Sequence, residues 1–247
     1  MAAYFISDIH LGANYIPDRR VHEQRVVSFL RSVEKDCTEL YLLGDILDFW
    51  FEYRNVVPRG FIRFFGQLAR MADNGVRILW IVGNHDIWLF DYLRDEIGIE
   101  VADGTVVREI LGKRFVMAHG DGIGNLKWSF RFMRGLFRNG TARMLAKAIH
   151  PRWLVGFAHN WSGHSKKRGG YTLPEEVALN PYLSFAAEYN STHHDAPADY
   201  FLFGHQHVLV SEHIPENNAL VAIIGDWLKI FSYLRFDGEK LDILRFE

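Results

Sequence analysis

Side chains of the kinds that bind metal ions recur in five short segments, each at the end of an apolar run. The segments are Asp8-Ile9-His10, Gly44-Asp45, Gly83-Asn84-His85-Asp86, His119-Gly120-Asp121 and Gly204-His205-Gln206-His207. Carboxylate, amide and imidazole groups are common ligands of divalent metal ions in proteins. One such segment would mean little, but five in one chain predict a metal centre assembled at a common rim.

The first segment shows the geometry that we expect. In an extended backbone, side chains two residues apart point to the same side. Asp8 and His10 would then reach one point in space, while Ile9 turns back into the protein. The same rule directs His85 away from Asn84, which leaves His85 outside the metal shell.

The number of ligands suits two metal ions. Asp45 has two oxygens and no nearby carboxylate that could share the binding of both ions, so we expect Asp45 to bridge them. Imidazole and oxygen ligands without a thiolate fit Mn²⁺, Fe or Zn²⁺ better than a site for Mg²⁺ alone. Two such ions, ~3.5–4 Å apart, can hold a hydroxide and clamp a phosphoryl group for in-line attack. The expected ligands are Asp8, His10, Asp45, Asn84, His119, His205 and His207.

Polar side chains beside these ligands have other expected roles. His85 is free to hydrogen-bond the phosphate or to assist the leaving oxygen, so we expect it to be catalytic together with Asp45. Asp86 or Asp48 could orient a ligand. The remaining histidines have no comparable setting and are interpreted as surface or packing residues: His22, His150, His159, His164, His193, His194 and His213.

The elements that would position the five segments alternate between strand and helix. Apolar patterns predict strands at 4–7, 40–43 and 77–82, with one-sided helices at 19–35 and 60–72 between them. This order implies parallel strands, and ligands bind outside the carboxyl ends of such strands. A hairpin over 106–117 and five strand-like runs between 199 and 245 complete the pattern. We therefore expect an α/β fold of two mixed sheets packed face to face, with helices outside.

Residues 122–174 have a different composition from the rest of the chain. They contain ten Lys or Arg residues, no Asp or Glu, and several aromatic residues. We expect two or three short helices, broken at Gly140 and Pro151 and inserted between strands. A basic, aromatic-rich lid suits an anionic amphiphile or an anionic membrane surface, and an ordinary solvated helix face is the alternative. Candidates for contact with a substrate phosphate are Lys166, Lys167 and Arg168.

Composition restricts the remaining possibilities. The chain has 247 residues and a net charge of -2, which is consistent with one domain over 1–247 and indicates no partner by itself. A single cysteine, Cys37, excludes an internal disulfide. No apolar run approaches the ~20 residues that span a bilayer, so we expect a cytoplasmic protein. No nucleic-acid recognition motif is found, and the oligomeric state stays open.

The five segments, in this order, resemble the calcineurin-like metallophosphoesterases. Finer features resemble the UDP-2,3-diacylglucosamine hydrolases of lipid A biosynthesis: the run from Ser7 to Gly12, the run from Gly44 to Trp50, His119-Gly120-Asp121, the basic insertion and Gly225-Asp226-Trp227. The resemblance implies a four-layer α/β/β/α sandwich. It also implies cleavage of the pyrophosphate of UDP-2,3-diacylglucosamine to lipid X and UMP, usually with Mn²⁺, on the cytoplasmic face of the inner membrane. The helical insertion would form a lid over the acyl chains.

The resemblance also implies a division of the ligands. It places Asp8, His10, Asp45 and His207 on one metal ion, and Asp45, Asn84, His119 and His205 on the other. Asn84, His85 and Asp121 are further expected to contact the substrate. One residue departs from the pattern, because well-known members carry Arg where this chain has His85, the commoner residue in the wider superfamily.

Two alternatives to a lipid-nucleotide hydrolase stay open. The same scaffold could act on another phosphodiester or on a soluble nucleotide. A non-catalytic module that binds lipid or membrane, with a vestigial site, is the second alternative.

Overall fold

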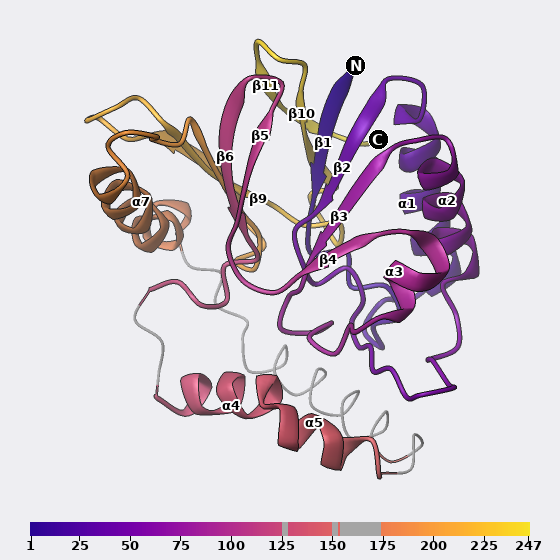
Figure 1. Ribbon diagram of the computed structural model, residues 1–247. Coiled ribbons are helices and arrows are strands. Elements are labelled where there is room, and N and C mark those ends of the chain that lie inside the picture. The colour runs from indigo at the N-terminus through magenta and orange to yellow at the C-terminus, as the bar shows by residue number, and fades with distance from the viewer. Residues whose placement is uncertain (125–127, 150–152, 154–173) are drawn as a thin grey trace.

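The protein is built on two β-sheets packed face to face, with helices on both outer sides (Figure 1). The structure is a computed structural model and describes residues 1–124, 128–149, 153 and 174–247. Lys166, Lys167 and Arg168, and the break expected at Pro151, lie outside the described residues.

The first sheet has six strands in the order β11-β10-β1-β2-β3-β4. Strands β1 to β4 run parallel to one another, whereas β10 and β11 are antiparallel. The parallel strands all deliver their carboxyl ends to one edge of the sheet. The strands are β1 (Ala2–Ile6), β2 (Cys37–Leu42), β3 (Arg77–Ile81), β4 (Glu100–Ala102), β10 (Ser232–Phe236) and β11 (Leu241–Arg245), and the helices of this half are α1 (Arg19–Val33), α2 (Ile62–Asp73) and α3 (Tyr92–Ile97).

The second sheet has five strands in the order β5-β6-β7-β9-β8. Strands β6, β7 and β9 are parallel, and β5 and β8 are antiparallel edge strands. Its elements are β5 (Val106–Ile110), β6 (Lys113–Ala118), β7 (Tyr200–Phe203), β8 (Leu209–His213), β9 (Leu220–Ile224) and helix α7 (Glu175–Thr192).

Three apolar layers hold these elements together. Alternate side chains of one strand face opposite sides, so Phe5 enters the layer between the sheets while Tyr4 and Ile6 face α1 and α2. The layer between the sheets includes Phe5 and Phe115, whose rings stack with centroids 5.4 Å apart. Helix α7 covers the outer face of the second sheet through residues such as Tyr182. A fully buried side chain of this size contributes about 1.5–3 kcal/mol, and the layers confirm the predicted α/β/β/α order.

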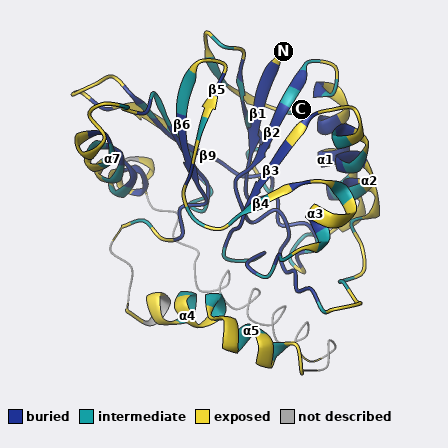
Figure 2. Ribbon diagram, viewed as in Figure 1, coloured by how far each residue is buried: buried dark blue, intermediate teal, exposed yellow. Residues whose placement is uncertain are grey.

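Two short helices, α4 (Trp128–Arg138) and α5 (Gly140–Ala146), lie beyond the end of the sandwich (Figure 1). The break between them falls at Asn139, whose side chain caps α5 by accepting from the amides of Thr141 and Ala142. This agrees with the break expected at Gly140. Figure 2 shows exposed residues along much of α4 and α5, whereas strands β1 and β2 of the sandwich are mostly buried.

Several boundaries differ from those that the sequence predicts. Helix α2 begins at Ile62 and not at residue 60, because Phe61 has a left-handed φ of 59°. One of the five strand-like runs expected between 199 and 245 covers residues 229–236, but the strand begins only at Ser232. Asp226 accepts from the amides of Leu228, Lys229 and Ile230 and so holds a turn there. Among the described residues, no helix is long and apolar enough to cross a membrane.

Candidate metal centre

The side chains predicted to bind metal all lie at one edge of the sandwich, where five parallel strands end. They follow β1 (Asp8 and His10), β2 (Asp45), β3 (Asn84), β6 (His119) and β7 (His205 and His207). Ligands from three strands of the first sheet therefore meet ligands from two strands of the second.

The first cluster consists of Asp8, His10 and His207, whose ligand atoms lie within 4.8 Å of one another. Asp8 Oδ1 is 3.5 Å from His207 Nε2 and 3.9 Å from His10 Nε2. Both Asp8 Oδ1 and His10 Nε2 are buried and make no hydrogen bond to any described residue. Buried polar atoms are rarely left unpaired, so these two fit a cation between them.

The second cluster consists of Asp45, His119 and His205, again within 4.8 Å. His119 Nε2 is 3.4 Å from Asp45 Oδ2 and 3.1 Å from Asn84 Oδ1. The amide oxygen of Asn84 thus points to the same place as the three clustered side chains.

Asp45 stands between the two clusters. Its Oδ2 is 3.7 Å from His10 Nε2 and 3.4 Å from His119 Nε2, one histidine of each cluster. Its Oδ1 accepts from the backbone amide of His85 at 2.8 Å, which fixes the carboxylate in this orientation. A side chain at Gly83 would clash with Asp45 Oδ1, so glycine is required there. This is the position that a bridging ligand would occupy.

The Nδ1 atoms of these histidines are held by the protein. His119 Nδ1 lies 2.9 Å from the carbonyl oxygen of Leu43, and His207 Nδ1 lies 3.3 Å from Asp226 Oδ2. Because both partners accept a hydrogen bond, Nδ1 carries the proton and Nε2 points into the centre. Histidines that bind metal are typically oriented in this way.

Other side chains fix the carboxylates. Asp8 Oδ2 accepts from Ser7 Oγ at 2.6 Å and from the amide of His205 at 2.9 Å, which leaves Oδ1 to face the cluster. Asp86 accepts from the amides of Gly83 and Ile46, so it links the loops after β3 and β2. The sequence analysis did not assign Ser7 or Asp226 a role. Their only signal was membership of the family-like runs Ser7–Gly12 and Gly225-Asp226-Trp227.

The backbone at the ligands is not extended, and the sequence-based geometry was wrong on this point. Asp8, His10 and Asp45 each have φ of 52°, and His205 and His207 have 72° and 54°. Left-handed conformations cost non-glycine residues about 1–3 kcal/mol each and gather at functional sites. Asp8 and His10 do converge, but through this strained turn at the end of β1.

His85 belongs to the centre as well. Its ring centroid is 4.7 Å from that of His10, and its Nε2 lies 4.0 Å from Asp45 Oδ2. Asn84 turns towards His119, so the two neighbours diverge as expected, but both remain at the centre. The Nδ1 of His85 lies 3.0 Å from the carbonyl oxygen of Asp48, so Nε2 faces the centre and, with 22% of the side chain exposed, can be reached from solvent.

Asp48 lies behind two of these histidines. Its Oδ1 is 3.4 Å from His10 Nδ1 and 3.5 Å from His85 Nδ1. These three residues form a third group whose ligand atoms lie within 4.8 Å. His10 reaches Asp48 through Nδ1 and Asp8 through Nε2, the arrangement of a histidine that binds metal on one side and a carboxylate on the other. Asp48 is therefore suited to orienting His10 and His85, as the sequence suggested for it.

Burial and charge shift the acidity of the centre in opposite directions. Burial raises the pKa of Asp45, but the imidazoles of His119, His85 and His10 outweigh it and hold that pKa well below its usual range. Burial opposes protonation of His119, yet Asp45 raises the pKa of His119 to about 10. Burial and the adjacent His119 lower the pKa of His205 to about 4. A cation that binds beside Asp45 must therefore displace the proton of His119.

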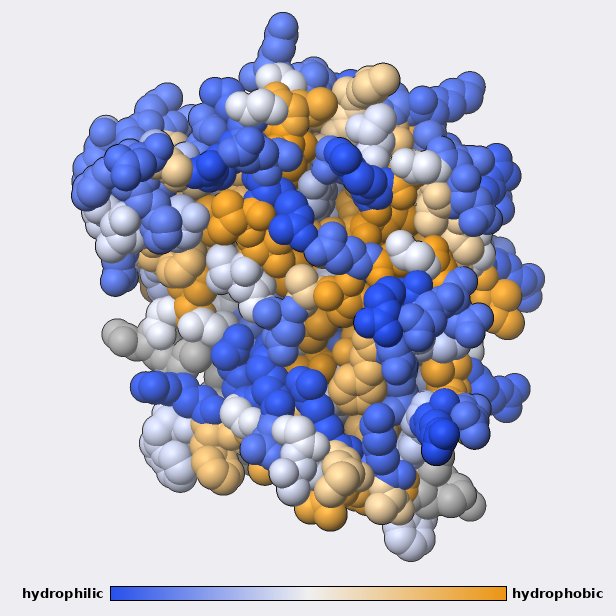
Figure 3. All heavy atoms as spheres, in the orientation of Figure 1, coloured by the Kyte–Doolittle hydropathy of each residue, from blue (hydrophilic) through white to orange (hydrophobic). Residues whose placement is uncertain are grey.

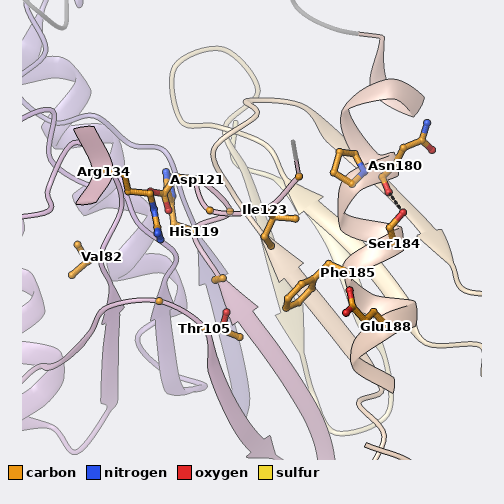
Figure 4. A pocket seen from close by; sticks show the side chains of 16 residues that line it. Val82, Thr105, His119, Asp121, Ile123, Arg134, Asn180, Ser184, Phe185 and Glu188 are labelled. Carbon is orange, nitrogen blue, oxygen red and sulfur yellow. Dashed lines mark hydrogen bonds and ion pairs between the residues drawn. The ribbon is translucent and has the colours of Figure 1, made fainter. Parts of the chain in front are cut away.

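One cavity adjoins the centre, and a second is lined by Trp88, three residues beyond His85. The α7 cavity, of about 660 Å³, extends from His119 and Asp121 to helix α7, where Pro181, Ser184, Phe185 and Glu188 line it (Figure 4). The Trp88 cavity, of about 540 Å³, lies between Trp88 and the helices α4 and α5, and the described residues of its lining are apolar except for Arg143.

Asp121 does not join either metal cluster. Its Oδ2 accepts from Arg134 Nε at 2.7 Å and from Arg138 Nη1 at 3.4 Å, so it ties α4 to the end of β6. It does line the α7 cavity, where a substrate could meet it.

Comparison with known proteins identifies the family. The model of the calcineurin-like phosphoesterases matches residues 1–209. The chain belongs to this family. Its buried His and Asp clusters are typical of the two-metal phosphoesterases, and the chain is a metallophosphoesterase hydrolase.

Similar proteins extend over nearly the whole chain. A UDP-2,3-diacylglucosamine hydrolase from Porphyromonas gingivalis is 39% identical and covers 96% of this chain and 95% of its own length. One from Neisseria meningitidis is 25% identical, with the same coverage of 96% and 95%. A solved archaeal phosphodiesterase superposes with a TM-score of 0.50 at 14% identity over 99% of both chains, which shows a shared fold.

Proposed function

We propose that this protein hydrolyses the pyrophosphate of UDP-2,3-diacylglucosamine to lipid X and UMP. The relative from Porphyromonas gingivalis carries the name of that activity and is similar over 96% of this chain. The structural observation that carries the proposal is the Trp88 cavity, because its apolar lining, which includes Trp88 three residues beyond His85, suits acyl chains.

The metal ligands are part of the proposal. Two divalent ions held there, Mn²⁺ in the first place with Fe or Zn²⁺ as alternatives, would supply an activated water and positive charge for the phosphoryl oxygens. One site would comprise Asp8, His10, Asp45 and His207, and the other Asp45, Asn84, His119 and His205. The unpaired Asp8 Oδ1 and the inward Nε2 atoms support this set.

His85 would act on the substrate and not on the metal. Its Nδ1 proton is engaged by the Asp48 carbonyl, so Nε2 is the atom presented to a phosphate oxygen. In the protonated form, this nitrogen can donate to the leaving phosphate and neutralise its developing charge. Asn84, which lies beside His119, and Asp121, which lines the α7 cavity, are proposed substrate contacts, as are Lys166, Lys167 and Arg168.

The segment 122–174 would serve as a lid that also touches an anionic membrane. Trp128, Phe132, Met144 and Leu145 are each more than 60% exposed on α4 and α5. In Figure 3, hydrophobic and hydrophilic side chains lie next to one another along the lower edge, over these helices. Large exposed apolar groups beside cations are typical of helices at a membrane interface. We accordingly place the protein in the cytoplasm, peripheral to the inner membrane.

A second candidate is hydrolysis of another phosphodiester or of a soluble nucleotide. It is favoured by His85, which occupies the position where well-known UDP-2,3-diacylglucosamine hydrolases carry Arg. A non-catalytic lipid-binding role has less support, since every ligand-type side chain is in place at the centre.

Product analysis tests the proposal directly. The purified protein, supplied with Mn²⁺, is incubated with UDP-2,3-diacylglucosamine in ¹⁸O water, and the masses of the products are measured by mass spectrometry. We expect lipid X and ¹⁸O-labelled UMP, which places attack on the phosphorus next to the nucleoside. Turnover of bis-p-nitrophenyl phosphate without turnover of the lipid nucleotide would favour the second candidate.

The Trp88 cavity separates the two candidates further. Ala146→Glu places a charge in the apolar wall, and Thr141→Glu places the same charge on an exposed part of α5 that does not line the cavity. For a lipid substrate, we expect Ala146→Glu to lower kcat/KM at least tenfold, while Thr141→Glu stays near wild type. Equal rates for both variants would contradict an acyl site there.

A further inference from the structure

The two cavities are connected to the metal centre through different segments of the chain. His119 belongs to the second metal cluster and also lines the α7 cavity. The segment that carries Asn84 and His85 continues within three residues to Trp88, which lines the Trp88 cavity. Helix α4 contributes to both walls, with Arg134 in the α7 cavity and Phe137 in the Trp88 cavity. A substrate whose pyrophosphate lies at the centre can therefore place one half in each cavity.

We propose that the α7 cavity binds the nucleoside half of the substrate, with UMP as its product ligand. This inference rests on the proposed function for the identity of the substrate. It adds a binding site on α7 and fixes the direction in which the substrate lies across the centre.

The linings of the two cavities differ in polarity, as do the nucleoside half and the acyl half of such a substrate. Among the residues that the structure describes, the Trp88 cavity offers apolar groups with Arg143 as its single charged residue. The α7 cavity combines apolar Ile123, Pro181 and Phe185 with polar groups on both walls. An acyl chain in the α7 cavity would displace the water that is hydrogen-bonded to those polar groups. Because the chain cannot replace these hydrogen bonds, its binding there would cost free energy. A nucleoside has a flat base for the apolar part and hydroxyls for the polar part.

One face of helix α7 forms one wall of this cavity. Pro181, Ser184, Phe185 and Glu188 follow the spacing i, i+3, i+4, i+7, which places them on one side of a helix. Figure 4 shows Phe185 and Glu188 pointing from this face into the cavity, across from Thr105. The ring of Phe185 can pack against a pyrimidine base, and the carboxylate of Glu188 can accept from ribose hydroxyls. The volume of about 660 Å³ lies within the range of small-molecule sites, about 300–1,000 Å³.

Charge also favours a nucleotide at this end. The guanidinium of Arg134 is bonded to Asp121 at 2.7 Å and lines the same cavity, close to His119. It is therefore placed to donate to a phosphate oxygen of a nucleotide whose base reaches α7. The leaving half, lipid X, then lies on the side of His85 and Trp88, where a proton donor for its phosphate is present.

Filling the cavity tests the inference. Ser184→Tyr projects a large side chain from α7, and Thr105→Tyr does so from the opposite wall; both residues are exposed. Ser191→Tyr is the matched control, because Ser191 is exposed on the same helix, about two turns beyond Ser184, and does not line the cavity. The readouts are the dissociation constant of UMP by calorimetry, with Mn²⁺ present, and the inhibition constants of UMP and lipid X.

The expected result separates the two products. In Ser184→Tyr and Thr105→Tyr, UMP should bind at least tenfold more weakly, while the inhibition constant of lipid X changes less than twofold. Ser191→Tyr should bind both as the wild type does. Unchanged UMP binding in both cavity variants, or weaker binding of lipid X in place of UMP, would overturn the inference. If one variant fails to fold, as judged by thermal unfolding, the other decides.

Failure of the proposed function gives a different result. If the wild type does not cleave UDP-2,3-diacylglucosamine, the proposed activity is wrong, and UMP binding to the wild type and to Ser184→Tyr still measures whether the cavity takes a nucleotide. If the wild type cleaves the lipid nucleotide but the cavity variants keep full affinity for UMP, the activity stands and only this site is wrong.

Discussion

The metal centre and the α4–α5 helices differ sharply in how they are held. At the centre, Asp8 and Asp45 are buried, and hydrogen bonds fix both carboxylates from several elements. Among the described residues, the α4–α5 helices are joined to the sandwich by contacts of single side chains, such as Trp88 Nε1 to the Phe137 carbonyl at 3.0 Å, Arg138 with Asp103 at 2.9 Å and Arg134 with the buried Asp121 at 2.7 Å. Exposed ion pairs contribute only about 0–1 kcal/mol. The chemistry is thus built into a rigid frame, whereas the part proposed to select the substrate is loosely attached.

The largest effect should come from the residue between the two clusters. Asp45→Asn keeps the shape of the side chain but removes the charge that both clusters share. We expect turnover to fall about 10³-fold or more, with loss of bound metal measured by atomic absorption. A variant that keeps both metal and near-normal turnover would show that the centre does not depend on this carboxylate.

His85→Ala should lower turnover without emptying the centre. Its imidazole faces the site but is proposed to act on the substrate, so we expect a loss of about 10²–10⁴-fold in kcat at unchanged metal content. Measurements of turnover and of metal content together separate action on the substrate from metal binding. Loss of metal in this variant would move His85 into the ligand set, within the group that it forms with His10 and Asp48.

Asp226→Asn should have a smaller effect, through His207. The side chain of Asp226 orients His207 from 3.3 Å and also holds three backbone amides that an asparagine oxygen can still accept from. Loss of such a partner typically lowers metal affinity about 10–100-fold. Titration of the metal-free protein with Mn²⁺ measures this affinity, and we expect excess Mn²⁺ to restore turnover. Turnover that stays low at saturating Mn²⁺ would indicate another role for Asp226.

The same substitution in the two regions should have opposite consequences. Gly83→Ala forces a methyl group against Asp45, so we expect a loss of about 1–3 kcal/mol in unfolding free energy. Gly135→Ala in α4 meets no atom within 4 Å and should be neutral or gain up to about 1 kcal/mol of helix stability. Thermal unfolding of both variants measures these changes in stability. Equal melting temperatures would contradict the difference between the metal centre and the α4–α5 helices.

Much of the centre could be predicted because strand ends carry a strong signal. An apolar run followed by Asp, Asn or His indicates both the edge of a sheet and a ligand, so the residues that meet there were named from sequence. The left-handed backbone at Asp8 and His10 could not be predicted, because it depends on packing between segments far apart in the chain. Helix α7 was missed because Pro181 lies inside it, and the cavity along α7 was missed with it.

The hydrogen bond from the His205 amide to Asp8 Oδ2 joins residues 197 positions apart. During synthesis, the first strand with Asp8 leaves the ribosome long before His205 and His207 exist. The first metal cluster therefore cannot form on a growing chain, even if the first half of that chain has already folded. Completion of this cluster has to follow synthesis of nearly the whole protein.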